Sequence, residues 1–171
     1  MKSLTKFLMI TILMGCSSMN YNKTVTNLDI QKFMGEWHVI AGRFTFLEKG
    51  VHNGLEVYSW NEKENRIDIE FSYNKEYFQG ERKTIAQKAW VENTHTNAHW
   101  KISPMWPLKL DYLVLELAKD YSWTVVGVPS GKYLWIMARD KKMSKDLLTK
   151  ILEDLKGKGY PVNNIVMVPH S

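Results

Sequence analysis

The sequence is poor in the residues that build cross-linked or repetitive proteins. It has one cysteine, five prolines and ten glycines among 171 residues. A single cysteine excludes a framework of intrachain disulfides and a zinc site made of several thiolates. The low proline and glycine content excludes collagen-like and low-complexity chains. The 23 basic and 18 acidic side chains are interleaved without a block of like charge, so no nucleic-acid partner is predicted.

Large rings, in contrast, are abundant. Aromatic residues make up 12% of the chain, with seven Trp and eight Tyr, and hydrophobic residues make up 44%. This composition is typical of a folded globular domain, and the length fits one domain. The fold must therefore house many rings, either in a core or around a lumen.

The one cysteine follows a segment with the features of a signal peptide. Lys2 and Lys6 are followed by an apolar run, residues 7–14, which is too short to cross a bilayer of about 30 Å as a helix. Residues 13–16, with the sequence Leu-Met-Gly-Cys, resemble the lipobox of bacterial lipoproteins. The resemblance implies cleavage before Cys16 and lipid attachment to it. The alternative is an ordinary secreted protein with a free cysteine.

This motif divides the chain into three parts. Residues 1–15 are predicted to be the lipoprotein signal peptide, residues 16–26 a lipidated tether, and residues 27–171 the folded domain. The tether is assigned because the segment after the cysteine is polar and lacks periodicity. Ser17 stands where an Asp would resemble a signal for retention in the inner membrane. The expected location is therefore the bacterial outer membrane, with the domain facing the periplasm.

The body of the chain predicts short β-strands. Runs rich in β-branched and aromatic residues recur between clusters of Gly, Asn, Pro or charged residues. They predict eight strands, at residues 35–43, 54–61, 65–74, 81–91, 97–103, 111–118, 122–128 and 132–139. In residues 66–73 apolar and polar side chains alternate, which leaves one face to water. The last three strands are apolar on both faces, so another element must cover them from outside.

A helix after the eighth strand is expected to supply that cover. Ser144 is a suitable N-cap, and Asp146 suits the positive end of a helix dipole. An apolar stripe at helical spacing follows, formed by Leu147, Leu148, Ile151, Leu152 and Leu155. A last short strand is expected at residues 164–168. Strands at hairpin spacing predict antiparallel order, and eight of them can close into a barrel, although periodicity leaves a sandwich open.

Three motifs, in this order, resemble the signatures of the lipocalins. Residues 28–41 resemble a short helical turn followed by the Gly-x-Trp opening of the first strand. Residues 119–121, Lys-Asp-Tyr, resemble the second signature, and residues 133–139 resemble the third. Together with the lipobox, the mature chain resembles the bacterial outer-membrane lipocalins of the apolipoprotein D group. The resemblance implies an all-β fold: an eight-stranded antiparallel up-and-down barrel with one C-terminal α-helix packed outside, so that residues 27–171 form a lipocalin domain.

The resemblance also assigns five fold residues. Gly35 allows close approach of the backbone, Trp37 plugs the closed end of the barrel, and the Arg139 cation lies across its indole ring. Asp120 and Tyr121 belong to the turn between the sixth and seventh strands. Lys119 departs from the Thr of the second signature.

A set of lumen-facing side chains follows from the same register. Starting from Trp37 as inward, alternation predicts that Val39 and Ala41 also face inward. The family register adds Ile67, Ile69, Phe71, Trp100, Ile102, Tyr112 and Val114, with Tyr58, Ala89 and Trp135 as further candidates. It also turns Glu56 and Glu116 inward. Carboxylates in an apolar lumen must pair with Arg or Lys, bind a cationic head group, or indicate a register wrong by one residue.

These residues predict a binding protein and not an enzyme. The expected function is a lipid-anchored periplasmic lipocalin that binds a fatty acid or lysophospholipid for lipid transport, storage or salvage. No Cys follows Cys16, and no Gly-x-Ser-x-Gly motif is present. One alternative is a barrel enzyme that uses Glu56 and Glu116 as acid and base. Another is a carrier of haem or another tetrapyrrole with His38 or His52 as the axial ligand.

Two further features concern partners. Residues 105–108 form a partly apolar loop that could shield the barrel opening, contact a membrane, form a homodimer surface or simply make a buried turn. His95 and His99 lie four residues apart outside any helix, so their side chains are not aligned. No metal or cofactor site is predicted.

Overall fold

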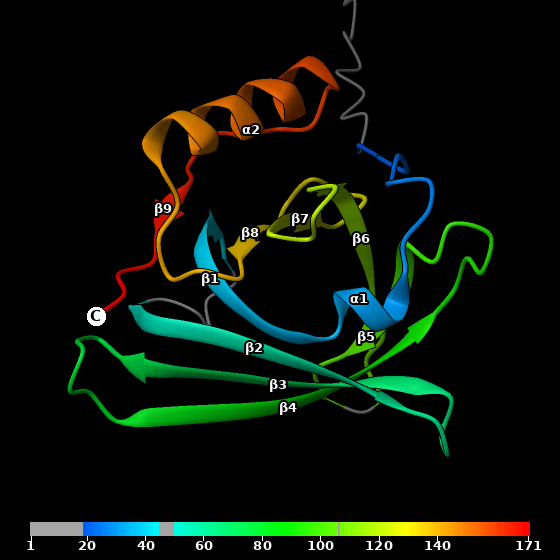
Figure 1. Ribbon diagram of the computed structural model, residues 1–171, viewed down its shortest axis with the longest axis horizontal. Coiled ribbons are helices and arrows are strands. Elements are labelled where there is room, and N and C mark those ends of the chain that lie inside the picture. Colours follow the sequence, from blue (N-terminus) through cyan, green and yellow to red (C-terminus); the bar gives the residue numbers. More distant parts are fainter. Residues whose placement is uncertain (1–18, 45–49, 106) are drawn as a thin grey trace, which may run out of the picture.

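Eight strands pair in sequence order and close into a barrel, because the first strand pairs with both the second and the eighth (Figure 1). The computed structural model describes residues 19–44, 50–105 and 107–171. The barrel contains β1 (Gly35–Arg43), β2 (Val51–Asn61), β3 (Arg66–Lys75), β4 (Arg82–Val91), β5 (His99–Ser103), β6 (Leu110–Leu117), β7 (Trp123–Gly127) and β8 (Leu134–Ala138). Each strand is antiparallel to the next, and β1 pairs with both β2 and β8. The predicted antiparallel barrel is confirmed, and the sandwich is excluded.

The barrel has two distinct ends. The helical turn α1 (Ile30–Phe33) lies at the start of β1 and covers what we call the closed end. The loops that follow β3, β5 and β7 lie at the opposite end, which we call the open end, because consecutive antiparallel strands reverse direction. The distance of a lumen-facing residue from α1 therefore shows how far it lies from the closed end.

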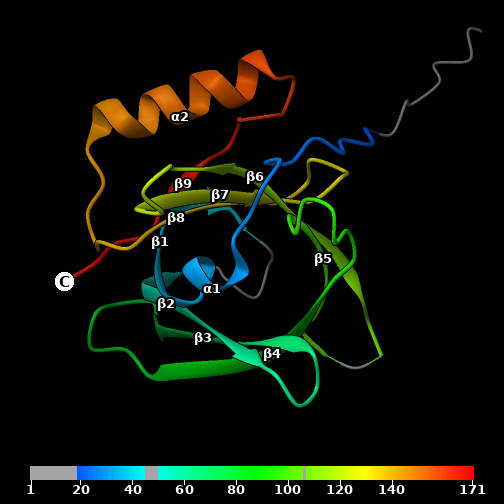
Figure 2. The same ribbon diagram turned by 45° about the vertical axis from the view of Figure 1, so that its right-hand side comes forward.

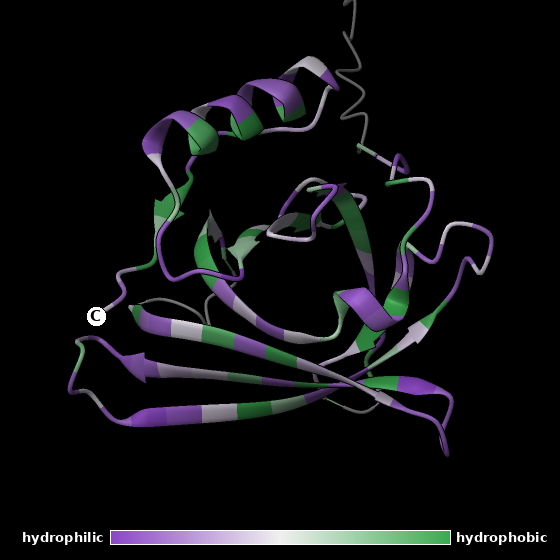
Figure 3. Cartoon of the chain, viewed as in Figure 1, coloured by the Kyte–Doolittle hydropathy of each residue, from purple (hydrophilic) through white to green (hydrophobic). Residues whose placement is uncertain are grey.

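The helix α2 (Lys145–Gly157) packs outside the barrel, as predicted (Figure 1). Ser144 caps it by accepting a hydrogen bond from the Leu147 amide at 3.2 Å. Figure 3 shows the hydrophobic side of α2 turned toward the barrel and its polar side turned away. The predicted stripe joins a cluster with outward-facing residues of β6, β7 and β8, including Leu113, Val125 and Ile136. The apolar outer faces of these strands are thus covered.

Most strand boundaries differ from the prediction by one or two residues, and the start of β2 differs by three. β2 begins at Val51, before the predicted start at residue 54, and it contains an irregularity where Asn53 takes a positive φ of 51° and the register with β3 shifts. The last strand, β9, contains only Val166–Met167 and pairs with β1 at Ala41 and Gly42. It occupies the edge that β2 leaves, since β2 pairs with β1 only from Gly35 to His38.

Part of the predicted tether packs on the barrel. Three backbone hydrogen bonds hold it there. The Tyr21 amide donates to the Pro129 carbonyl at 2.8 Å, and the Val25 amide donates to the Val114 carbonyl at 3.0 Å. The Leu28 amide donates to the Thr96 carbonyl, also at 3.0 Å. Pro129 lies in the open-end loop after β7 and Thr96 in the closed-end loop after β4. The segment therefore runs along the barrel from the open end to the closed end, beside β6 (Figure 2).

Candidate ligand-binding site

The closed end is sealed by the predicted signature residues. Trp37 is fully buried, and its indole nitrogen donates to the Phe33 carbonyl at 2.8 Å. The Arg139 guanidinium lies 3.7 Å from the centre of that indole ring, which confirms the predicted stacking. Gly35 has a φ of 97°, and a Cβ there would lie 3.3 Å from an Arg139 nitrogen. The Tyr121 hydroxyl accepts from the Asp29 amide at 2.9 Å and so fixes the start of α1.

Most of the predicted lumen residues do lie in the barrel interior. They belong to one apolar cluster with Trp37, either buried or packed against it: Val39, Tyr58, Ile67, Ile69, Phe71, Ala89, Trp100, Ile102, Tyr112, Val114 and Trp135. Their placement agrees with the predicted register. Their role as ligand contacts stays a prediction.

Three rings form a row along one wall of the lumen. Trp100 and Tyr112 stack with ring centres 5.3 Å apart and planes within 6° of parallel. Trp135 continues the row, 6.5 Å from Tyr112 and tilted by 25°. Ring faces aligned in this way give a flat apolar surface that an acyl chain or a cation can contact.

Glu56 does face inward, and a chain of hydroxyl groups reaches it. Its side chain is only 7% exposed and accepts a hydrogen bond from the Tyr58 hydroxyl. The Tyr58 and Tyr112 hydroxyl oxygens are 2.5 Å apart. Because Tyr58 gives its one proton to the carboxylate, Tyr112 is the donor to Tyr58. Burial, and then the charge of Glu56, raises the pKa of Tyr58 well above its ordinary value, so this donor stays protonated.

The prediction that Glu116 faces the lumen is wrong. The pairing of β6 with β7 shifts by one residue between Val114 and Glu116, and a shift of one residue turns a side chain to the other face. Glu116 instead forms an ion pair with Lys158, just beyond α2. The two carboxylates that the enzyme alternative needs therefore lie on opposite faces of the barrel wall.

The prediction for Ala41 is wrong for the same reason. The pairing of β1 with β8 shifts between Val39 and Ala41. Val39 stays in the interior cluster, whereas Ala41 joins the cluster under α2. The residue between them, Ile40, is the extra residue of the bulge.

The interior cluster also contains residues that were not among the predicted site residues, including Tyr73, Val126 and Met137. Tyr73 extends the alternation of Ile67, Ile69 and Phe71, and it stacks on Phe71 with ring centres 5.1 Å apart. Val126 and Met137 are also buried in the interior cluster. Alternation continued from Trp135 could have found Met137, since residues two apart in a strand share a face.

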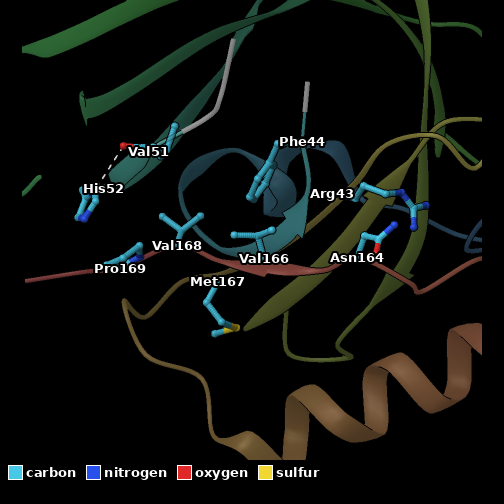
Figure 4. Close-up of a pocket in the computed structure, with 10 residues that line it drawn as sticks. Arg43, Phe44, Val51, His52, Asn164, Val166, Met167, Val168 and Pro169 are labelled. Atoms are coloured by element: carbon cyan, nitrogen blue, oxygen red, sulfur yellow. Dashed lines mark hydrogen bonds between the residues drawn. The ribbon is translucent and has the colours of Figure 1, made fainter. Parts of the chain in front are cut away.

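A hollow lies beside the open end (Figure 4). It measures about 420 Å³ and lies between the end of β1, the start of β2 and β9. In Figure 4 the side chains of Phe44, Val166 and Val168 converge on it, whereas Met167 points away. This hollow could not be predicted from the sequence, because β9 is distant from β2 along the chain.

Four histidines contact other side chains of the protein. The ring of His38 lies 5.5 Å from that of His170 on the outer side of β1, and the ring of His52 lies 5.0 Å from that of Phe78. His99 lies 2.6 Å from an Asp111 oxygen. Within the described ranges, no three His, Cys, Asp or Glu side chains converge to hold a metal ion.

Some predictions fall on other parts of the chain. The signal peptide, Cys16 and Trp106 lie outside the described residues. Among the residues that are described, no helix has the length and apolar character needed to cross a bilayer.

Fold and lumen together define a class of protein: a small closed barrel whose apolar interior can enclose one small hydrophobic ligand. The model of the lipocalin-like domain family matches residues 28–170, and the chain belongs to this family.

Individual relatives agree with this assignment. The chain is 26% identical over 170 residues to the outer membrane lipoprotein Blc of Vibrio cholerae serotype O1, with 98% of each chain covered. It is also 26% identical to the protein of the same name from Escherichia coli strain K12, covering 92% of this chain and 89% of that one. Among solved structures, the cockroach allergen Per a 4 superposes with a TM-score of 0.66 at 16% identity, covering 90% of this chain and 96% of that one. This last likeness concerns the fold alone.

Proposed function

We propose that the protein is a lipid-anchored lipocalin that binds a single-chain lipid, a fatty acid or a lysophospholipid, in its lumen. The observation that carries the proposal is the apolar interior with its row of rings and one buried carboxylate. An acyl chain gains roughly 0.8 kcal/mol for each buried CH₂, so such a lumen needs no reactive group to bind it. The role we propose is transport, storage or salvage of lipids in the cell envelope.

Glu56 is proposed to select the head group. Its pairing partner in β1 is Trp37, so it lies in the half of the lumen next to the closed end. A cationic choline or ethanolamine group would contact the Glu56 carboxylate and the neighbouring ring faces. The acyl chain would then run toward the open end past Phe71 and Tyr73.

Calorimetric titration with two ligands tests this assignment. The Glu56→Gln variant should bind lysophosphatidylcholine roughly ten- to hundredfold more weakly, since a hydrogen bond or contact to a charged group contributes about 1.5–3 kcal/mol. Its affinity for palmitate should rise or stay equal, because the fatty-acid carboxylate no longer meets a like charge. Glu116→Gln, on the outer face, is the matched control and should change neither affinity. Equal loss for both ligands would contradict the selective role of Glu56.

The anchor is proposed from the lipobox and is supported by the relatives named outer membrane lipoproteins. We place the protein in the bacterial outer membrane, facing the periplasm and held by acyl chains on Cys16. Two or more acyl chains give a stable anchor, whereas one is marginal. Native mass spectrometry of the membrane-extracted protein tests both parts. We expect a chain that starts at Cys16 with attached acyl groups, together with a non-covalent lipid. An unmodified Cys16 would disprove the anchor, and a bound tetrapyrrole would disprove the ligand class.

A further inference from the structure

Exposed apolar side chains gather at the open end of the barrel. Tyr77 and Phe78, in the loop after β3, are 57% and 38% exposed. Met105 and Leu108, in the loop after β5, are 73% and 48% exposed, and Leu110 at the start of β6 is 40% exposed. Both loops follow strands that run toward the open end, so they border this end at two separate places on its rim. We call these five residues the apolar rim. A concentration of exposed apolar residues on one end marks a contact surface.

The chain also leaves the barrel at this end. Tyr21 is bound to Pro129 in the loop after β7, and the Met19 sulfur lies so close to Gly131 that a Cβ there would be 2.7 Å from it. Cys16 precedes Met19 by three residues. Three residues span at most roughly 11 Å when fully extended, so an anchor on Cys16 must remain close to the open end.

Two lysines of the open-end loops lie beside aromatic rings. The Lys109 ammonium lies 4.7 Å from the ring centre of Trp90, and that of Lys132 lies 5.4 Å from the ring centre of Tyr133. Both lysines are exposed. Lysines beside aromatic rings are characteristic of membrane interfaces, where the ammonium contacts anionic head groups.

We propose that the open end faces the membrane and that the apolar rim rests in the head-group region of the leaflet that carries the anchor. The inference rests on the proposed acylation of Cys16. The short link from Cys16 to Met19 determines which end of the barrel faces the membrane. An anchor held near the closed end would instead leave the apolar rim in water. In this orientation a lipid passes between the bilayer and the lumen without crossing the aqueous phase.

Environment-sensitive labels on single cysteines test this orientation. Thioether formation consumes the Cys16 sulfur, so one introduced cysteine becomes the only free thiol. Met105→Cys and Phe78→Cys place an NBD fluorophore in the apolar rim. Lys63→Cys places it in the exposed turn between β2 and β3, at the closed end, as the matched control. The acylated proteins are reconstituted into vesicles of phosphatidylethanolamine and phosphatidylglycerol.

The rim labels should shift to shorter emission wavelength, brighten several-fold and be quenched by brominated lipids, whereas the Lys63→Cys label should behave as in water. Rim labels that stay water-like on vesicle-bound protein would overturn the inference and leave the anchor intact. A protein that stays in the supernatant with a free Cys16 thiol would instead disprove the anchor. Rim labels that are shielded in a dimer in detergent, without vesicles, would assign the rim to a second copy and overturn the membrane as its occupant.

Discussion

Arg139 does more than cover the indole ring of Trp37. Its guanidinium donates to the backbone carbonyls of Lys32 at 2.8 Å, Met34 at 3.0 Å and Glu36 at 2.7 Å. These carbonyls belong to α1 and the start of β1, so one side chain ties the helical turn to the barrel. Burial lowers the pKa of Arg139, but a guanidinium remains charged at all physiological pH values.

Replacing Arg139 tests this arrangement. Arg139→Lys keeps the charge but loses the planar fork of donors, so some carbonyls lose their partner. We expect the free energy of unfolding in urea to fall by about 1–3 kcal/mol. Arg66→Lys is the matched control, because Arg66 pairs with the partly exposed Asp68. This substitution should lower the free energy of unfolding by less than about 1 kcal/mol. Equal losses for the two variants would contradict the bracing role.

The stacking of Arg139 on Trp37 could be predicted from the sequence, but its carbonyl partners could not. The motif fixes which two side chains meet, whereas the carbonyl positions depend on how α1 folds under the barrel. Ala41 and Glu116 were mispredicted because each follows a bulge. Neither Ile40 nor Leu115 differs in type from an ordinary strand residue, so alternation alone carries no sign of the extra residue.

At the scale of elements, α2 was predictable because its signals are local: an N-cap and a stripe at helical spacing. The last strand was also expected, but its short length and its pairing with β1 were not, because they depend on how much of the edge of β1 is free. The segment 166–171, which we call the C-terminal strap, closes over that edge. The Val168 amide donates to Ile40 at 2.9 Å, and His170 Nε2 lies 2.8 Å from the Val39 carbonyl oxygen.

The strap should loosen as the pH falls. Burial, and then the positive charge of Lys141, lowers the pKa of His170, although its bond to Val39 acts the other way. Burial, then His170 and Lys141, lowers the pKa of His38, against the weaker effects of Glu36 and Asp140. A histidine with a lowered pKa in the folded state binds its proton more readily when unfolded, so stability falls as the pH drops below about 6.5.

Urea unfolding measured between pH 5 and pH 8 checks this expectation. The midpoint of the wild-type protein should decrease below the ordinary histidine pKa, and His170→Gln should reduce that decrease. His95→Gln, in an exposed loop, serves as the control and should leave the pH dependence unchanged. A wild-type midpoint that is constant from pH 8 to pH 5 would disprove the effect.

At the scale of the whole molecule, the sequence predicted the barrel and the outer helix, because strand count, hairpin spacing and the motif order agree. It did not predict that residues 19–26 pack along the wall. Tyr21 is 9% exposed and meets Tyr160 edge to face at 5.0 Å. That contact forms between residues distant in sequence, and the polar, non-periodic segment around Tyr21 gives no local sign of it.

Tyr21 should therefore decide where the chain leaves the barrel. Tyr21→Ala removes the buried ring, which contributes about 1.5–3 kcal/mol, so the segment before Leu28 should open roughly ten- to hundredfold more often. Hydrogen exchange of residues 19–28 should accelerate by that factor, while β3 and β4 keep their protection. Tyr77→Ala, at an exposed position, should leave exchange in residues 19–28 unchanged. Released from Pro129, the longer link also lets the barrel tilt, so an NBD label at Met105→Cys should lose part of its lipid quenching in the Tyr21→Ala background. Unchanged exchange in residues 19–28 would show that backbone bonds alone hold the segment.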